Sequence, residues 1–301
     1  MKSNLRAIVA LSATDADENL IRYARQVAKI GFCRHFYFVH VRSAAQVARD
    51  GRAGEEIREV CEAKIAELFG EPPQGVTYDC RVLTGERVDA LIDFILHNRC
   101  DLAFLGHRKH RSGQRSLARR LAMISPCSVW MVPEGAPVSI SGIIAPVDFS
   151  ENSGDSLETA ASIAHATGLR SVLATHIFFD PSTVRYDEHV EEILALEKHT
   201  FEEFVAKRDL KGVDVDLSMV EGNNVARSIL HTASRHTCDL IVMNTRGRSR
   251  AAAILLGSTT TQVMIESPVA VLAVKHFGAM MNLFQALEES QFWRRRSPKT
   301  N

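Results

Sequence analysis

The chain has 301 residues, of which 46% are hydrophobic and 24% are charged, and its 36 basic and 36 acidic residues give a formal net charge of zero. This composition is typical of a folded globular protein, and the length suggests about two domains of roughly 150 residues each. Zero net charge excludes a global electrostatic attraction to nucleic acid or to an anionic membrane. We therefore expect no nucleic-acid partner, and any electrostatic binding must be local.

The amino-terminal segment leads directly into an apolar stretch at 6–11, without the longer apolar core of a secretory signal peptide. No apolar run approaches the roughly 20 residues that a membrane-spanning helix needs. We therefore expect a cytoplasmic protein without a transmembrane segment. The six cysteines are scattered and form no C-x-x-C pair, so we expect most of them to be small buried hydrophobic residues and not zinc ligands.

The first half of the chain alternates short apolar runs with longer helical patterns. Strands are predicted near 6–11, 36–42, 76–83, 101–105 and 127–132, and helices near 15–30, 53–69, 86–98 and 115–124. The strands are apolar at consecutive positions, which indicates burial on both faces. Strands that alternate with helices then predict a parallel sheet with helices on both sides.

The second half repeats this pattern after a linker that contains Pro and Gly. Its strands are predicted near 142–147, 171–177, 213–220, 239–243 and 269–274, and its helices near 151–167, 187–208, 223–237 and 255–266. Five segments match the first half in the same order, among them 100–106 with 238–244. We predict a first domain at 1–133, a linker at 134–141, a second domain at 142–276 and a tail at 277–301.

A basic, glycine-containing segment follows the fourth strand of the second half. It reads NTRGR from Asn244 to Arg248. Nine residues separate Gly247 from Gly257, and from Gly257 to Thr259 the segment reads GST, where a helix opens. Parallel sheets bind ligands at the carboxyl ends of their strands. Glycine permits close backbone approach, a helix N-terminus favours phosphate, and arginines add charge-assisted donors. The segment therefore suits an anion.

The same segment resembles the ATP-binding signature of the universal stress protein family, which is Gly, two residues, Gly, nine residues, Gly and then Ser or Thr. Gly247, Gly257 and Ser258 match this spacing, whereas Asn244 stands at the first Gly. Asn tolerates the left-handed backbone better than most residues. The loop therefore keeps its shape if Asn244 takes the conformation of a glycine.

The resemblance also implies further nucleotide contacts in the second half. Asp148 matches an Asp near the nucleotide, the backbone of Ile177 would hold adenine, and Val220 would line the adenine pocket. The complete predicted set of nucleotide-binding residues is Asp148, Ile177, Val220, Asn244, Arg246, Gly247, Arg248, Gly257, Ser258 and Thr259. The alternative is that the arginines, Arg250 included, form a solvated basic loop and that Ser258 is merely a helix N-cap.

The first half departs from the signature at nearly every ligand position. Ser12 replaces the Asp, the loop after the fourth strand is four residues shorter, and Lys109 stands at the middle Gly. This loop is either a solvated surface loop or a site for a different anion. We expect His40 and His176, near the end of the second strand of each half, to be satisfied inside the repeat.

The resemblance implies two tandem doubly wound, five-stranded parallel-sheet domains of the Rossmann-like, adenine nucleotide alpha hydrolase-like class. It also implies an intrachain pseudo-dimer in which 127–132 pairs with 269–274, and it leaves further homodimer formation open. No catalytic constellation is found, because Asp148 is the only plausible carboxylate. The expected function is a stress-response or regulatory protein that binds ATP or a related adenine nucleotide in its second domain. A ligand-independent scaffold and a weak ATPase are the alternatives.

Overall fold

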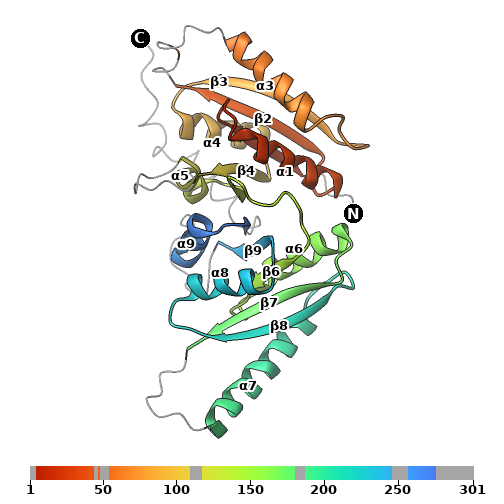
Figure 1. Cartoon of the computed structure of the whole chain (residues 1–301), viewed down its shortest axis with the longest axis vertical. Coiled ribbons are helices and arrows are strands. Elements are labelled where there is room, and N and C mark those ends of the chain that lie inside the picture. The colour runs from red at the N-terminus through yellow and green to blue at the C-terminus, as the bar shows by residue number, and fades with distance from the viewer. Residues whose placement is uncertain are drawn as a thin grey trace.

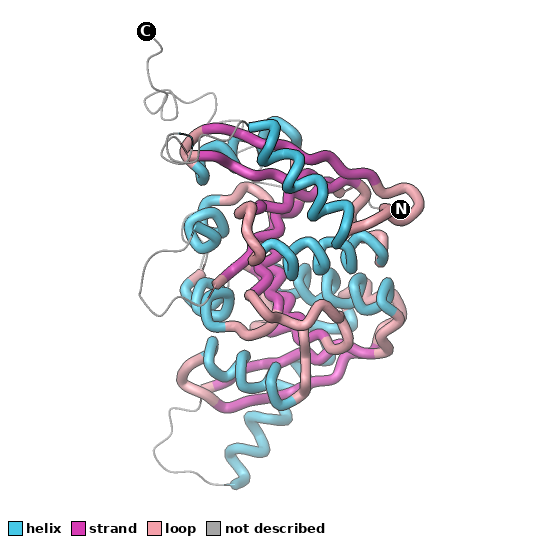
Figure 2. Tube along the Cα trace, turned by 45° about the horizontal axis from the view of Figure 1, so that its top comes forward, coloured by secondary structure: helices cyan, strands magenta, loops and turns pink. Residues whose placement is uncertain are grey.

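The computed structural model describes residues 5–43, 47, 54–108, 117–179, 187–245 and 257–275. Within these ranges the chain forms one ten-stranded sheet in the order β3-β2-β1-β4-β5-β10-β9-β6-β7-β8. The strands run through the centre of the molecule, and helices lie on both sides (Figures 1 and 2). The predicted tandem, doubly wound α/β architecture is confirmed.

The first half supplies five strands, which pair in parallel with one another. Its elements are β1 (Arg6–Leu11), α1 (Asp17–Lys29), β2 (His35–Arg42), α3 (Gly54–Leu68), β3 (Thr77–Thr84), α4 (Arg87–Asn98), β4 (Leu102–His107), α5 (Leu117–Ile124) and β5 (Ser128–Pro133).

The second half repeats the arrangement, again with parallel pairing among its own strands. Its elements are β6 (Ile143–Pro146), α6 (Glu151–Thr167), β7 (Ser171–Phe178), α7 (Asp187–Ala206), β8 (Asp214–Glu221), α8 (Val225–Arg235), β9 (Leu240–Asn244), α9 (Ser258–Glu266) and β10 (Ala270–Val274).

Two apolar layers, one on each face of the sheet, form the core. Ala7 and Val9 of β1 pack in the layer of α1 and α3, whereas Ile8 between them packs in the layer of α4 and α5. The first layer continues under α6 and α7, and the second continues under α8 and α9. Successive residues of a strand point to opposite faces, so a strand buried on both sides must be apolar throughout.

The two halves join through their last strands. β5 and β10 pair antiparallel, with Met131 opposite Val271 and Trp130 opposite Leu272. Trp130 is fully buried and stacks on Phe104, with 5.4 Å between ring centroids. The pairing confirms the predicted intrachain pseudo-dimer, and it covers two strand edges that would otherwise be exposed.

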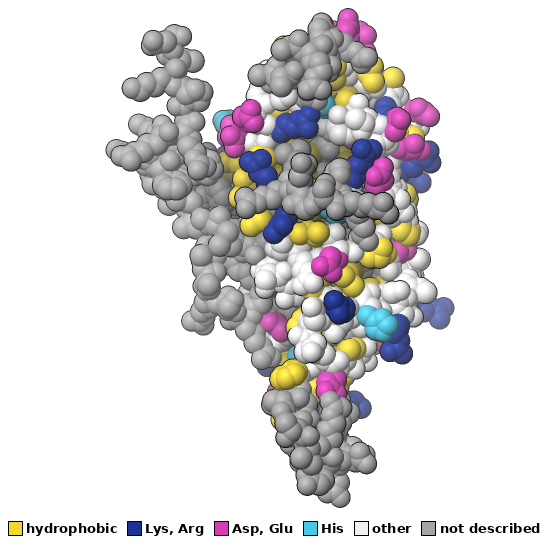
Figure 3. All heavy atoms as spheres, turned by 60° about the vertical axis from the view of Figure 1, so that its left-hand side comes forward, with side chains coloured by type: hydrophobic (Ala, Val, Ile, Leu, Met, Phe, Trp, Pro, Cys, Tyr) yellow, Lys and Arg dark blue, Asp and Glu magenta, His cyan; other side chains and the backbone are white. Residues whose placement is uncertain are grey.

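Among the described residues, no helix has both the length and the apolar character that crossing a membrane requires. Basic and acidic side chains are interspersed on the face shown in Figure 3. All six cysteines are buried with free thiols, which confirms the expectation that they serve as small core residues. Burial raises the pKa of Cys127 to about 11.

Candidate functional site

Each half changes its strand order beside its first strand. β1 lies between β2 and β4, and β6 lies between β7 and β9. The chain therefore leaves the first strand toward one side of the sheet and later returns on the other side. A crevice opens at the carboxyl ends of strands at such a point, and this is where open α/β sheets bind ligands.

Three segments of the second half meet at the carboxyl ends of β6 and β9. The side-chain amide of Asn244 donates to the carbonyl of Asn152 in α6 (2.8 Å), and the Asn244 carbonyl accepts from Thr260 Oγ1 in α9 (2.9 Å). The Gly257 N–H donates to the Thr245 carbonyl (2.8 Å). These bonds tie the end of β9 to the starts of α6 and α9. Near this junction lie five of the predicted site residues, which are Asp148, Asn244, Gly257, Ser258 and Thr259.

The backbone of Asn244 does not have the left-handed conformation that a glycine often adopts. Asn244 is the last residue of β9, it is paired in register with Val274, and it is not among the residues with positive φ. The condition that it takes the conformation of a glycine is therefore not met, because pairing with β10 keeps the residue in the strand. Its side chain instead holds the backbone at the start of α6, which a glycine could not do.

Gly257 brings α9 close to the end of β9. Gly257 is the N-cap of α9, so the alternative reading of Ser258 as the cap is wrong. A Cβ on Gly257 would lie 3.3 Å from the carbonyl oxygen of Thr245, which is a tight backbone contact. No described side chain caps the helix. Its first N–H groups and its dipole therefore favour an anion at this point.

Asp148 lies between β6 and α6. Its Oδ1 accepts from the N–H of Ser150 (3.1 Å) and from Ser150 Oγ (2.6 Å). Ser150 is the N-cap of α6, and its Oγ accepts from the Ser153 N–H (3.2 Å). The half-buried carboxylate is thus held in place by the turn that starts the helix.

Ile177 and Val220 are opposite each other on β7 and β8. Both are half-buried, and a Cβ on the nearby Gly222 would lie 3.6 Å from Cγ2 of Ile177. The two positions predicted to contact adenine are therefore direct neighbours. Arg246, Gly247 and Arg248 lie outside the described residues, as does Arg250.

His40 and His176 occupy the same place in the two halves. Nδ1 of His40 bonds to the Leu11 carbonyl (3.1 Å), and Nδ1 of His176 bonds to the Val147 carbonyl (2.9 Å). Each ring thus links the second strand to the end of the first, which confirms that both are satisfied inside the repeat. Burial lowers the pKa of His40.

The first half keeps a carboxylate in this region, but at a different sequence position. The N–H and Oγ of Ser12 donate to Asp17 Oδ1 (2.8 and 2.7 Å), and the Thr14 N–H donates to Asp17 Oδ2 (3.2 Å). In the second half, the N–H of Asp148 donates to Ser153 Oγ (3.4 Å). Ser and Asp have therefore exchanged places between the two halves. Sequence comparison missed this exchange because it registered only the Ser at position 12.

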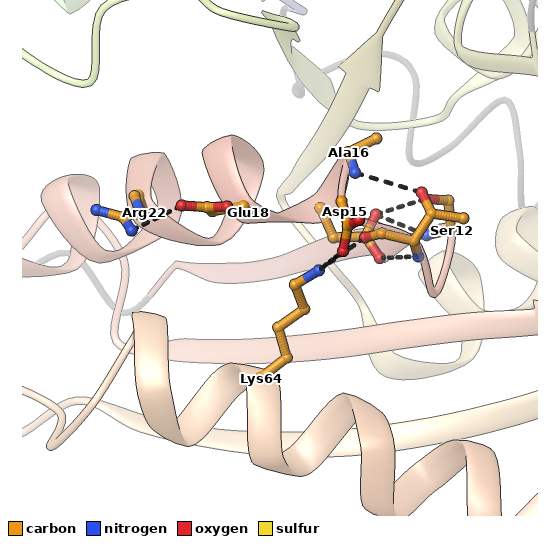
Figure 4. Close-up of polar contacts among 8 residues, drawn as sticks. Ser12, Asp15, Ala16, Glu18, Arg22 and Lys64 are labelled. Atoms are coloured by element: carbon orange, nitrogen blue, oxygen red, sulfur yellow. Dashed lines mark hydrogen bonds and ion pairs between the residues drawn. The ribbon is translucent and has the colours of Figure 1, made fainter.

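The turn that carries Ser12 is otherwise equivalent to its counterpart. Ala13 and Phe149 follow the first strand in each half, and both have a left-handed backbone, with φ of 57° and 61°. In the first half, Lys64 of α3 reaches across to Asp15 Oδ1 (3.1 Å), as Figure 4 shows. The backbone of the turn is thus retained although its side chains differ.

A cavity of about 400 Å³ opens at the carboxyl ends of β1 and β4 in the first half. Its apolar lining comes from all around this edge and includes Ala10, Leu11, Leu20, Val39, Val41, Leu91, Leu105, Leu121 and Val132. Its polar lining includes Ser12, Thr14, Asp17, Asn19, Arg87, His107, Arg108 and Glu134. The sequence did not predict this cavity, because its volume depends on the packing of segments far apart in the chain.

Comparison with known proteins accounts for the tandem repeat. The sequence profile of the universal stress protein family matches residues 4–133 and again 141–275. The chain belongs to the universal stress protein family. A Thermus aquaticus relative, the universal stress protein in QAH/OAS sulfhydrylase 3'region, is 29% identical over 134 residues, which are 44% of this chain and 97% of the relative.

A solved structure that spans both domains shares the fold of this universal stress protein. A universal stress protein from Archaeoglobus fulgidus DSM 4304 covers 92% of this chain and 98% of its own, with a TM-score of 0.64 and 17% identity. Another, solved in complex with cAMP, matches 44% of this chain and 96% of its own, with a TM-score of 0.35 and 22% identity.

Proposed function

We propose that the second domain binds an adenine nucleotide, ATP or a close analogue, at the carboxyl ends of β6 and β9. The observation that carries the proposal is the contact of Gly257 with Thr245. It places the start of α9, which has no side-chain cap, directly against the end of β9. A glycine N-cap at a change of strand order suits a phosphate group bound by backbone N–H groups.

The phosphates would lie at the start of α9, near Ser258 and Thr259. The segment between β9 and α9 contributes Arg246, Gly247 and Arg248 in sequence, and arginine donors to phosphate are strong and often bidentate. Asn244 would support the site by linking the start of α6 to the start of α9 through its two hydrogen bonds.

The nucleoside would lie toward β7 and β8. Ile177 and Val220 adjoin there and offer an apolar surface with main-chain groups at the end of the strand. Asp148 would lie beside the nucleoside and away from the phosphates, because a carboxylate accepts hydrogen bonds from neutral donors and repels anions.

This arrangement supports a binding role more than a catalytic one. Asp148 is held by Ser150 at the start of α6, where it serves the fold. A bound nucleotide would regulate the protein by stabilising one arrangement of this edge over another. The size of that shift is limited by the difference in nucleotide affinity between the two arrangements.

Calorimetric titration with ATP tests the proposal. We expect wild type to bind and Gly257→Arg to bind at least about tenfold more weakly, which corresponds to about 1.4 kcal/mol. The large side chain must enter the narrow space beside the Thr245 carbonyl. Leu196→Arg is the matched control, because it adds the same charge at a helical position of α7 that is 67% exposed.

Equal binding by wild type and Gly257→Arg would contradict the proposed site. No binding by wild type at millimolar ATP would favour the ligand-independent scaffold. Release of phosphate from ATP that disappears in Asp148→Ala would favour the weak ATPase. Circular dichroism of each variant establishes that loss of binding is not loss of fold.

A further inference from the structure

We propose that the cavity of the first domain binds a small amphipathic monocarboxylate, with its apolar part between β1, α4 and α5 and its carboxylate on Arg87. This inference does not depend on nucleotide binding by the second domain. Three observations carry it, namely the apolar lining, the pairing of the other charged groups, and the environment of Arg87.

The cavity is suited to the apolar body of a small molecule. Its volume of about 400 Å³ lies within the roughly 300–1,000 Å³ that is typical of small-molecule sites. Side chains from four strands and three helices form the apolar wall, among them Val39, Leu91, Leu105, Leu121 and Val132. Transfer of an alkyl chain from water into such a site is favourable, and the gain increases with each buried CH₂ group.

The other charged lining groups already have partners in the protein. Asp17 accepts three hydrogen bonds from Ser12 and Thr14. The Arg108 guanidinium pairs with the Glu134 carboxylate at 3.1 Å. These groups therefore form a polar wall that is largely satisfied within the protein.

Arg87 is the exception. It is half-buried and lines the cavity, yet its guanidinium forms no hydrogen bond or ion pair with the residues that the structure describes. It is the first residue of α4, and its N-cap Glu86 makes no side-chain capping bond. The dipole of α4 and the guanidinium therefore favour an anion at the same point, and Arg matches the planar geometry of a carboxylate.

Arg87 distinguishes the two domains. The corresponding first residue of α8 in the second domain is Val225, which is exposed. Among the described lining residues, the charges of Asp17, Glu134, Arg87 and Arg108 cancel. Such a wall suits a ligand with one negative charge on a neutral body better than a nucleoside triphosphate with several.

Calorimetry with two matched probes on the full chain tests the proposal. Octanoate carries the charge, and octan-1-ol has the same apolar chain without it. We expect octanoate to bind wild type and to bind Arg87→Val at least about tenfold more weakly, because Val removes the charged hydrogen-bond donor for the carboxylate. Octan-1-ol should bind both proteins equally. Arg87→Val is a mild change, because it introduces the residue that the second domain carries at this place.

The outcomes separate the proposal from its alternatives. No octanoate binding, or equal binding by wild type and Arg87→Val, would overturn it. Displacement of octanoate by ATP in the Gly257→Arg background would also overturn it, because the cavity would then be a nucleotide site. If Arg87→Val weakens octanoate binding and leaves ATP binding unchanged, the two ligands bind at independent sites. Weakened octanoate binding supports the first-domain site even if wild type binds no ATP.

Discussion

Exchange of Ser12 and Asp17 in the first domain offers a direct test of the structural equivalence between the two halves. Ser12→Asp together with Asp17→Ser recreates the arrangement of Asp148 and Ser153. Thr14 is already in place to support the new carboxylate. Its Oγ1 lies 2.7 Å from Ser12 Oγ, much as Ser150 Oγ lies 2.6 Å from Asp148 Oδ1 in the second half.

The single substitutions should both destabilise the protein. Asp17→Ser removes charged hydrogen bonds to the N–H groups of Ser12 and Thr14, and a hydroxyl recovers only part of them, so we expect a loss of about 2–4 kcal/mol. Ser12→Asp places a second carboxylate against Asp17. Two charges about 4 Å apart at an effective dielectric constant near 20 repel by about 4 kcal/mol, or one of them must take a proton.

The double variant should regain most of this loss and unfold within about 1 kcal/mol of wild type, which gives a coupling free energy of about 3 kcal/mol or more. Urea unfolding measures it, with Trp130 of the first domain as the fluorescent reporter in a Trp293→Phe background. Additive losses in the double variant would refute the equivalence. They would show that the two turns are stabilised differently despite their shared backbone conformation.

Two further predictions concern parts of the fold outside the sites. Burial lowers the pKa of His40, so the unfolded chain binds more protons. Neutral His40 contributes its full stability above the unfolded pKa of about 6.5, and this contribution is lost as the pH falls through the folded pKa. Gln has no such proton equilibrium. The urea midpoint of His40→Gln should therefore decline less steeply than that of wild type between about pH 8 and pH 5. Gly142→Ala should destabilise by about 1–2 kcal/mol in urea. The Cβ that this substitution adds would lie 3.2 Å from Cys238 Cα and 3.3 Å from the Thr237 carbonyl oxygen. Both are backbone atoms, which move little to make room for a side chain.

The fold could be predicted from the sequence because its information is local. A strand buried on both faces is apolar at every position, and this pattern located β1 and β9 within a residue or two of their observed ends. The pairing of the last strands was implied by the family resemblance, and it covers two equivalent edges. Neither inference needed the position of a side chain in space.

The details of the site could not be predicted in the same way. Asn244 holds the carbonyl of Asn152, which lies 92 residues away, and no local pattern reports such a contact. The carboxylate of Asp17 serves the turn at Ser12 from five positions further along, so an alignment of positions records it as absent. The Asp17 carboxylate could have been located from the acidic residues in the first turn of α1, because this helix directly follows the turn after β1.

The exchange between Ser12 and Asp17 bears on how strongly Asp148 supports nucleotide binding. A carboxylate accepts hydrogen bonds from this turn in both domains, whether it comes from Asp17 or from Asp148. Its first role is therefore to satisfy the turn between the first strand and the first helix, and Asp148 alone is weak evidence for a ligand. The contact of Gly257 with Thr245 is a stronger argument for nucleotide binding. A phosphate site needs two backbones that approach closely at a helix N-terminus, whereas a solvated loop does not need such a contact. Substitution of Gly257 is for this reason the more decisive experiment, and substitution of Asp148 should lower stability as well as affinity.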